Sequence, residues 1–586
     1  MKGVAEIEIS SARSQPPAGA TRRPSPKLVR VEWINSPVPG APPEVADQAY
    51  QIAIRRTGIV IMASAPAGFR YALITLRAII AASRNRIRAV DVIDWPDFKV
   101  RGVMLDVSRD KVPTMATLRR LIAMFAALKY NQLQLYIEHT FRYRDHPAVW
   151  RGASPFTPAQ IRTIDRECRS CGIELVPNQN SLGHMERWLK HDRYAPLAEY
   201  DGPYLAPWGE TRTLPTTLNP IDPRSIRLVD SLYAELLPCF SSRILNVGCD
   251  EPFELGQGKS RKRCEEIGAG RVYFDFLMKI RRAAAVHGRR IQFWSDWIQH
   301  NPEMIDRLPR DVTSLVWGYE ADHPFELECS RSAKAGVPFY VCPGTSSWCS
   351  IAGRTSNMKA NLLAAAEAGR TAGAEGYLLT DWGDYGHRQT LPVSYAGFLY
   401  AAAVAWCRKS NADIDLGDEL SRRVFEDKKG VLGRAWLDAG RVHELSGALQ
   451  KNRSVLFSCL AGDLFDPKSS FGVKPSAVGR IEDRIAMIRG SLAKAAPKSD
   501  DAKLVMDEIR LTLDVLEHAC HRLRLIQAPA DSNARVMSAK RLAREMRAIM
   551  REHARIWRLR NRPGGLASSL SYYERNLEEY RTLLRS

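Results

Sequence analysis

Two adjacent carboxylates, Asp250 and Glu251, directly follow a short apolar run at residues 244–247. That run has the length expected of a strand that is buried on both faces. Neighbouring side chains point to opposite faces within a strand, but beyond its end both acids can turn into one pocket. Acids at the carboxyl end of a parallel strand stand where α/β barrels keep their chemistry. An isolated acidic pair can also simply begin a loop, so the surrounding elements have to decide.

Around this acidic pair, strands and helices alternate between about residues 99 and 410. The eight expected strands cover residues 102–107, 133–137, 173–176, 244–247, 291–294, 314–317, 338–342 and 376–379. Helical periodicity fills most of the intervals between them. Strict alternation predicts a parallel sheet, and eight units predict a closed (β/α)8 TIM barrel more readily than a doubly wound open sheet.

The flanking regions differ in composition and periodicity from this repeat. We expect a Pro-rich lead-in at 1–45, a small α/β domain at 46–98, the catalytic barrel at 99–410 and an α-helical C-terminal domain at 411–586. The small domain contains a predicted hairpin (50–54 and 59–62), a helix (67–82) and a strand (90–92). Predicted helices of the C-terminal domain cover 432–450, 478–495, 502–526, 538–558 and 570–584.

Composition limits the possible partners of this chain. The 586 residues carry 85 basic and 65 acidic side chains, so the formal net charge is +20, yet no long basic tract occurs. Dispersed charge favours a solvated basic surface over a nucleic-acid partner. The eleven cysteines form no disulfide framework, and the lone Cys168-x-x-Cys171 lacks a second pair at zinc spacing. We therefore expect a reduced, cytoplasmic protein without metal, cofactor, signal peptide or membrane span.

Polar and aromatic residues follow the expected strand ends. They are Arg109, Glu138, His184, Asp250, Glu251, Trp294, Trp317, Tyr340, Trp382 and Asp384. Each alone has an ordinary explanation, such as a surface ion pair, a structural histidine or a core tryptophan. Together on one rim they favour a sugar site, because indole faces pack on a sugar ring while carboxylates bind its hydroxyls. No glycine-rich phosphate loop follows the first strand, which argues against a nucleotide enzyme.

Four segments on this rim carry a resemblance to a known family. Residues 101–109 (RGVMLDVSR), 133–140 (LQLYIEHT), 177–184 (PNQNSLGH) and 246–251 (NVGCDE) resemble glycoside hydrolase family 20, the β-N-acetylhexosaminidases. The resemblance covers about residues 48–410, including a small α/β domain before the barrel. It implies an exo-acting, retaining hydrolase of terminal GlcNAc or GalNAc.

The resemblance also implies a substrate-assisted mechanism, in which the carbonyl oxygen of the 2-acetamido group is the nucleophile and an oxazolinium intermediate forms. Glu251 then acts as general acid and base, and Asp250 holds the acetamido N–H. Arg109 and Asp384 match residues that bind sugar hydroxyls, Glu138 joins them as a substrate-binding residue, and His184 supports the acids. Tyr340 is expected to donate to the acetamido carbonyl. The expected pocket walls are Trp294, Trp317 and Trp382.

One residue departs from the family pattern, and two alternative functions remain open. His139 stands where many relatives carry an acid, which is expected to alter specificity. The first alternative is a conventional β-glycosidase that uses two protein carboxylates. The second is a basic, non-catalytic sugar- or nucleic-acid-binding protein on a barrel scaffold.

Overall fold

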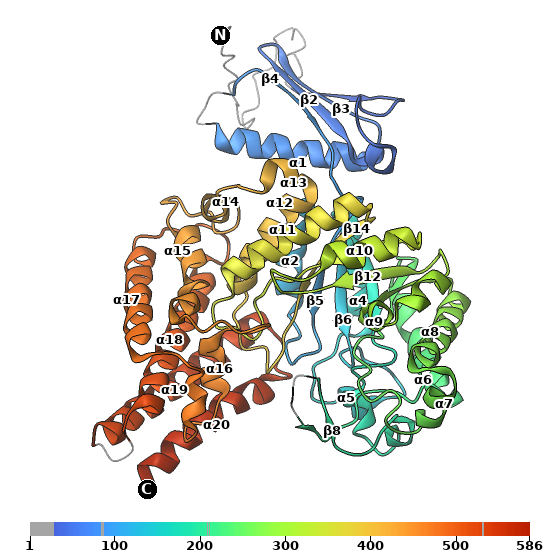
Figure 1. Cartoon of the computed structure of the whole chain (residues 1–586). Helices are drawn as coiled ribbons and strands as arrows, with labels where there is room; N and C mark the ends of the chain where they lie inside the picture. Colours follow the sequence, from blue (N-terminus) through green and yellow to red (C-terminus); the bar gives the residue numbers. More distant parts are fainter. Residues whose placement is uncertain (1–28, 84–86, 208, 210, 530–532, 586) are drawn as a thin grey trace. The chain divides into compact units, whose positions relative to one another are not determined.

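The computed structural model describes residues 29–83, 87–207, 209, 211–529 and 533–585 and divides into two compact units (Figure 1). One unit contains residues 1–99 together with 405–409, and the other contains 100–404 together with 410–586. The predicted domain limits at 45, 98 and 410 stay predictions. Of the predicted lead-in, residues 1–28 lie outside the described residues, and the remainder contains a strand, β1(Val29–Trp33).

The smaller unit is a four-stranded sheet with one long helix. Its elements are β1, η1(Pro43–Gln48), β2(Tyr50–Arg55), β3(Gly58–Ala63), α1(Pro66–Ala82) and β4(Val90–Asp94). The strand order is β1-β3-β2-β4. β2 and β3 pair antiparallel, which confirms the predicted hairpin. β1 pairs parallel to β3 and was not predicted, since it lies among prolines that argue against a strand.

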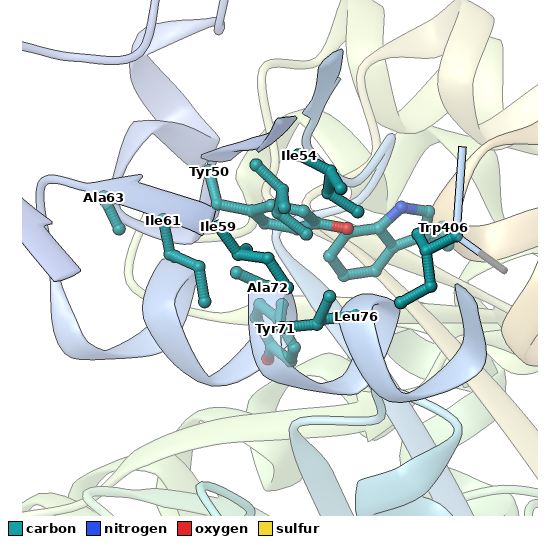
Figure 2. Close-up of a cluster of buried hydrophobic side chains, with 11 residues drawn as sticks. Tyr50, Ile54, Ile59, Ile61, Ala63, Tyr71, Ala72, Leu76 and Trp406 are labelled. Carbon is teal, nitrogen blue, oxygen red and sulfur yellow. The ribbon is translucent and has the colours of Figure 1, made fainter. Parts of the chain in front are cut away.

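Alternating apolar residues of β2 and β3 build the core of this unit. Ile54, Ile59 and Ile61 are buried and pack with Tyr71 of α1 and with Trp406, as Figure 2 shows. The Trp406 indole N–H donates to the carboxylate of Asp94 at 3.0 Å, so its one polar atom is satisfied inside an apolar cluster.

The larger unit is built on a closed barrel of eight parallel strands. The strands are β5(Val100–Asp106), β6(Gln132–Ile137), β7(Glu174–Gln179), β10(Ile244–Asn246), β11(Arg290–Trp294), β12(Thr313–Trp317), β13(Phe339–Cys342) and β14(Gly376–Asp381). β14 pairs with β5 and closes the ring. This confirms the predicted (β/α)8 barrel, flanked by a small α/β domain and a helical C-terminal region. The acidic pair follows the fourth barrel strand, β10.

Helices surround the barrel and connect its strands (Figure 1). They are α2(Met115–Ala127), α3(Pro147–Trp150), α4(Pro158–Ser170), α5(Glu186–Leu189), α6(Pro223–Leu236), α7(Arg261–Ile267), α8(Ala269–Val286), α9(Asp296–His300), α10(Phe325–Lys334) and α11(Thr355–Ala372). After the last strand, β14, the chain continues into α12(Pro392–Trp406) and α13(Arg408–Asn411). Short 3-10 helices are η2(Ala195–Leu197), η3(Leu237–Cys239) and η4(Pro302–Arg307), and a two-stranded ribbon, β8(Tyr204–Leu205) with β9(Thr211–Arg212), extends the loop after β7.

Side-chain amides from four neighbouring strands form a hydrogen-bonded network inside the barrel. The side-chain carbonyl of Gln134 accepts from Asn178 at 3.1 Å and from Asn246 at 3.0 Å. The Gln134 amide donates to Gln292 at 3.0 Å. Buried polar groups of this kind are stable only when hydrogen-bonded to one another. These four amides connect β6, β7, β10 and β11 inside the barrel.

The remaining helices form the C-terminal region. They are α14(Leu416–Arg423), α15(Leu432–Ala439), η5(Val442–Ser446), α16(Val455–Ala461), η6(Pro467–Ser470), α17(Pro475–Leu492), α18(Ala502–Gln527), α19(Asn533–Arg560) and α20(Leu566–Arg585). The prediction of one helix over 432–450 was wrong, because α15 ends before Gly440 and a 3-10 turn follows. A side chain at Gly440 would collide with Thr355, so tight packing on α11 selects glycine there.

The C-terminal region packs directly on the barrel. The Thr117 hydroxyl of α2 donates to the carbonyl of Arg560 at 2.6 Å, and the Arg560 guanidinium pairs with buried Glu508 of α18. In the part of the chain that the structure describes, no helix is long and apolar enough to cross a membrane.

Candidate functional site

The acidic pair sits on a tight turn after β10. Gly248, Cys249 and Glu251 adopt positive φ angles of 69°, 69° and 49°, a left-handed conformation that costs free energy for residues other than glycine. Gly183 approaches this turn so closely that a Cβ there would lie 2.1 Å from the Asp250 carbonyl oxygen. The turn brings Asp250 and Glu251 to one cavity, as the position of the pair after a strand predicts.

His184 contacts both acids. Its Nε2 lies 3.2 Å from Oδ2 of Asp250 and 3.4 Å from Oε2 of Glu251. Burial by itself lowers the pKa of His184, but the neighbouring carboxylates, Asp250 first, more than offset burial and hold that pKa well above 6.5. Nε2 can therefore hydrogen-bond with both carboxyl groups, while Nδ1 lies 3.4 Å from Nη2 of Arg109.

Asp296 fixes the backbone of Glu251 from the other side. Its Oδ2 accepts the Glu251 N–H at 3.1 Å, and its Oδ1 accepts the indole N–H of Trp317 at 3.3 Å. Burial, together with the charges of Asp250 and Glu251, raises the pKa of Asp296 well above its usual value. The sequence places Asp296 directly after a strand, but it does not show that this carboxyl group lies near those of Asp250 and Glu251.

Arg109 lines the same cavity, and its Nη2 lies 3.4 Å from Nδ1 of His184. Its guanidinium lies 3.2 Å from Asp106, 3.4 Å from Glu138 and 3.8 Å from Asp384. Burial raises the pKa of Asp384 to about 6, although Arg109 opposes the shift. Burial likewise raises the pKa of Glu138, again against the effect of Arg109. Of these three acids, Asp384 lines the cavity, whereas Asp106 and Glu138 contact Arg109 but are not among the described residues that line it.

The same guanidinium lies against two aromatic rings that meet edge to face, with their centres 4.8 Å apart. It lies 4.7 Å from the centre of Tyr136 and 4.9 Å from that of Trp382. Such stacking fixes the plane of an arginine, whose rigid fork then presents its donors in one direction. The strand-end prediction for Arg109, Glu138 and Asp384 thus leads to side chains that lie together.

The two acids, His184 and Arg109 line one cavity of about 430 Å³. Its aromatic lining consists of Trp294, Trp317, Tyr319, Trp348 and Trp382. The Trp382 indole donates to the Tyr319 hydroxyl at 2.8 Å, and Trp317 stacks on Tyr319 with ring centres 5.1 Å apart. The volume and the mixture of indole faces and carboxylates fit a single sugar residue.

The structure corrects the placement of one predicted residue, Tyr340. Its side chain is buried within the barrel against Gly376, where a Cβ would touch the ring, and it is not among the described residues that line the cavity. Tyr319, two residues beyond β12, presents its ring to the cavity instead. The sequence pattern could have indicated Tyr319, because it lies two residues after Trp317, just beyond a strand. The side-chain alternation within β13 alone does not show that Tyr340 faces the barrel interior and not the cavity.

A residue far along the sequence completes the cavity. The Asn452 side chain accepts the indole N–H of Trp348 at 2.9 Å, and its backbone N–H donates to Glu320 at 2.7 Å. Glu320 in turn pairs with Arg354. No strand-end pattern points to Asn452, because it comes from the C-terminal helical region. His300 and His323 also line this side of the cavity.

The described residues of this site do not form a donor set for a metal ion. Among the described residues, no group of three or more His, Cys, Asp or Glu side chains is arranged to hold a metal ion. The acids of the cavity instead face histidine, arginine and indole partners. Fold and site together define the chain as a (β/α)8-barrel protein with a carbohydrate-sized acidic pocket at the carboxyl ends of its strands.

Comparison with known families identifies the chain more closely. Residues 98–361 match the glycosyl hydrolase family 20 catalytic domain, and residues 6–95 match the glycosyl hydrolase family 20 domain 2. The chain belongs to glycoside hydrolase family 20. Both matches agree with the resemblance carried by the four rim segments.

Curated relatives are distant. Hexosaminidase D of Homo sapiens is 26% identical over 315 residues, which cover 50% of this chain and 62% of that protein. Beta-hexosaminidase of Vibrio furnissii is 22% identical over 355 residues, covering 53% of this chain and 54% of that protein. The chain thus spans less than two thirds of the length of either relative.

Solved structures share the fold at low identity. A beta-N-acetylhexosaminidase structure superposes with a TM-score of 0.56 and 19% identity, covering 70% of this chain and 91% of that one. The chitobiase of Flavobacterium johnsoniae gives a TM-score of 0.52 and 16% identity, with 85% and 83% covered. These likenesses establish the shared architecture.

Proposed function

We propose that this protein is an exo-acting, retaining β-N-acetylhexosaminidase that removes terminal GlcNAc or GalNAc by substrate-assisted catalysis. The observation that carries the proposal is the contact of His184 with both Asp250 and Glu251 inside a cavity walled by tryptophans. The names of the hexosaminidase relatives support the same activity.

The two acids receive different tasks because their exposures differ. The Glu251 side chain is 29% exposed and the Asp250 side chain 8%. Glu251 therefore reaches the open cavity, where it protonates the leaving oxygen and then activates water. Asp250, deeper and bound to His184, accepts the acetamido N–H and stabilises the positive charge of the oxazolinium intermediate.

The acetamido group needs a donor for its carbonyl oxygen, which is the nucleophile. Tyr319 takes this role in our proposal in place of Tyr340, because its hydroxyl stands in the cavity wall beside Trp382. The walls Trp294, Trp317 and Trp382 exclude water from this nucleophile and keep it against the anomeric carbon.

The outer hydroxyls of the sugar bind at the Arg109 end. Arg109 donates to them and Asp384 accepts from them, while Glu138 holds the Arg109 guanidinium at 3.4 Å. Ring stacking on Arg109 holds these donors in place before the sugar arrives. A terminal sugar held by its outer hydroxyls explains an exo mode of action.

Substitution of the proposed acid tests the function. Glu251→Gln is expected to fold normally and to lose about 10²- to 10⁴-fold in kcat on an aryl β-N-acetylglucosaminide. Glu326→Gln, an exposed change of the same type on α10, is the matched control and keeps full activity. Wild-type turnover by Glu251→Gln would refute the assignment.

The two alternatives give different results with other ligands. A conventional two-carboxylate glycosidase cleaves an aryl β-glucoside, which lacks the acetamido group, whereas our proposal predicts negligible cleavage. A thiazoline mimic of the cyclised intermediate should inhibit the enzyme strongly. Salt-dependent nucleic-acid binding without hydrolysis would favour the binding-protein alternative.

We further propose that the enzyme acts in the cytoplasm. Cys168 and Cys171, the lone Cys-x-x-Cys, are free thiols, and burial raises the pKa of Cys168 so that it stays an unreactive thiol. Fractionation of cells that express the full chain tests this location.

A further inference from the structure

A second pocket, of about 340 Å³, lies beside the catalytic cavity. The loops after β5, β6 and β7 contribute to it, and so does the start of α20 in the C-terminal region. We call it the side pocket and define it by Ser108, Asp110, His139, Arg151, Arg187 and Lys190, together with Gly565 and Ser568. None of these residues has a task in the proposed hydrolysis.

The side pocket carries an excess of positive charge. Arg187 lies 3.5 Å from Asp110, so these two charges compensate each other. Arg151 and Lys190 have no carboxylate within ion-pair distance in the described part of the chain. Lys190 and Arg187 also repel each other, and burial together with this repulsion lowers the pKa of Lys190. Clustered cations of this kind are stabilised when an anion binds between them.

The start of α20 adds to this positive field. The helix runs for 20 residues from Leu566, and Gly565 and Ser568 at its first turn line the pocket. A helix N-terminus bears a partial positive charge and free N–H groups. The first turn contains no acidic residue. The Ser568 hydroxyl donates to Asp110 at 3.2 Å, which further compensates the one carboxylate of the pocket.

An unsatisfied buried group lies in the same wall. His139 is only 5% exposed, and its Nδ1 has no hydrogen-bond partner among the described residues. Burial lowers the pKa of His139 to about 3, and the charges of Arg187 and Lys190 add to the effect, so the imidazole is neutral. A buried polar atom without a partner marks a place where a ligand or water supplies the missing bond.

We propose that the side pocket binds a small oxyanion, that is, a sulfate, phosphate or carboxylate group. Two sources of the group fit its place. Ser108 and Asp110 flank Arg109 in sequence, and His139 follows Glu138, so the side pocket adjoins the end of the catalytic cavity assigned to the outer hydroxyls. The anion is either a substituent of the glycan, which rests on the proposed function, or a free inorganic anion, which does not.

Binding of inorganic sulfate tests the pocket without any hydrolysis. Titration calorimetry at fixed ionic strength, with chloride as the replaced salt, is expected to show saturable sulfate binding to the full chain. The double variant Arg151→Gln/Lys190→Gln should bind at least about tenfold more weakly, since it loses two charged donors. The matched control is Lys262→Gln/Arg282→Gln, which removes one exposed lysine and one exposed arginine elsewhere on the barrel.

A second arm distinguishes the two sources. For aryl β-N-acetylglucosaminides with a sulfate ester on O3, O4 or O6, a glycan-borne anion predicts a higher kcat/KM than for the plain glycoside. The Arg151→Gln/Lys190→Gln variant should lose that preference and keep its activity on the plain glycoside. A free anion predicts sulfate binding with no preference for any sulfated substrate.

Equal sulfate affinity in wild type, double variant and control would overturn the inference. A wild-type protein that shows no saturable sulfate binding would also overturn it. Sulfate binding without hydrolysis of any glycoside would leave the side pocket standing and refute the proposed function. Hydrolysis of the glycoside without sulfate binding would support the proposed function and refute the side pocket as an anion site.

Discussion

Nε2 of His184 lies 3.2 Å from Oδ2 of Asp250 and 3.4 Å from Oε2 of Glu251. One imidazole therefore sets the separation of the two acids that a strand end merely places side by side in sequence. Its own φ of 55° is left-handed, a conformation that a non-glycine residue holds only when its surroundings enforce it. Gly183, just before it, allows the loop to approach the Asp250 backbone.

Replacing His184 should lower the rate more than it lowers binding. His184→Gln keeps a polar side chain beside Arg109, whose Nη2 lies 3.4 Å from Nδ1 of His184, and it leaves the indole walls intact. We therefore expect KM to change little, while kcat falls by about 10- to 100-fold because the acids lose their alignment. The pH profile should also shift, because the substitution removes His184, whose own pKa lies well above 6.5, from its contact with both acids. Steady-state kinetics between pH 4 and 9 measures both effects.

His287→Gln is the matched control for this experiment. His287 pairs with Asp230 at the end of α8, away from the cavity. If His184→Gln raised KM alone and left the pH profile unchanged, His184 would be a binding residue and its positioning role would be wrong.

The raised pKa of Asp384 predicts that the binding of the sugar substrate depends on pH. Burial raises its pKa to about 6, so above that pH it is a carboxylate, which is a stronger acceptor for a sugar hydroxyl than the protonated acid. KM should therefore rise as the pH falls through about 6, and the carboxamide of Asp384→Asn, which cannot ionise, should abolish this inflection. KM measured in half-unit steps from pH 5 to 8 tests it.

A loss of activity in Asp384→Asn at every pH, with the inflection retained, would assign the titration to another group. Asp322→Asn is the matched control, because Asp322 pairs with Lys451 at the surface.

Asn452 predicts that the C-terminal region shapes the catalytic cavity. Asn452→Ala removes the acceptor of the Trp348 indole and leaves a partly buried N–H unpaired, which costs about 1 kcal/mol. We expect kcat/KM to fall about fivefold, mainly through KM, as Trp348 becomes mobile.

Lys451→Ala is the neighbouring control, since Lys451 contacts only Asp322 at the surface in the described part of the chain. Equal effects of the two substitutions would mean that the whole turn is disturbed and that the Trp348 contact has no particular role.

The architecture was predictable because its determinants are local. Buried strands such as 133–137 have a continuous apolar or amide-bearing pattern, and the helices between them have clear periodicity. Each barrel strand ends within two or three residues of its predicted limit, so Arg109, Asp250 and Glu251 fall at the rim. Their common pocket then follows from the barrel geometry.

What the sequence did not reveal depends on contacts across long separations. Tyr340 lies within β13, and Tyr319 lies two residues beyond β12. The Tyr340 ring packs against Gly376 of β14, a contact between strands that the sequence does not show. Asn452 reaches the cavity from another region of the chain. The Gly440 break in a periodic helix likewise results from the contact with Thr355 and not from any local signal strong enough to end a helix.

Buried His553 predicts a loss of stability in acid. It is 4% exposed, and its Nε2 lies 3.0 Å from the Ser569 hydroxyl. Burial, then the charges of Lys111 and Arg388, lowers its pKa to about 3, whereas the unfolded chain keeps a value near about 6.5. Between these values only the unfolded state is protonated. The stability contributed by neutral His553 is therefore present above about pH 6.5 and declines as the pH falls, by at most about 1.4 kcal/mol per unit.

His553→Gln removes this titration. We expect the variant to be less stable than wild type at pH 7.5, because packing on Trp557 and Tyr573 is lost, but to lose less free energy of unfolding between pH 6.5 and 4.5. Urea unfolding at each pH measures the difference, and His287→Gln should retain the wild-type slope. Parallel curves for wild type and His553→Gln would show that His553 is protonated in the folded protein, contrary to its burial.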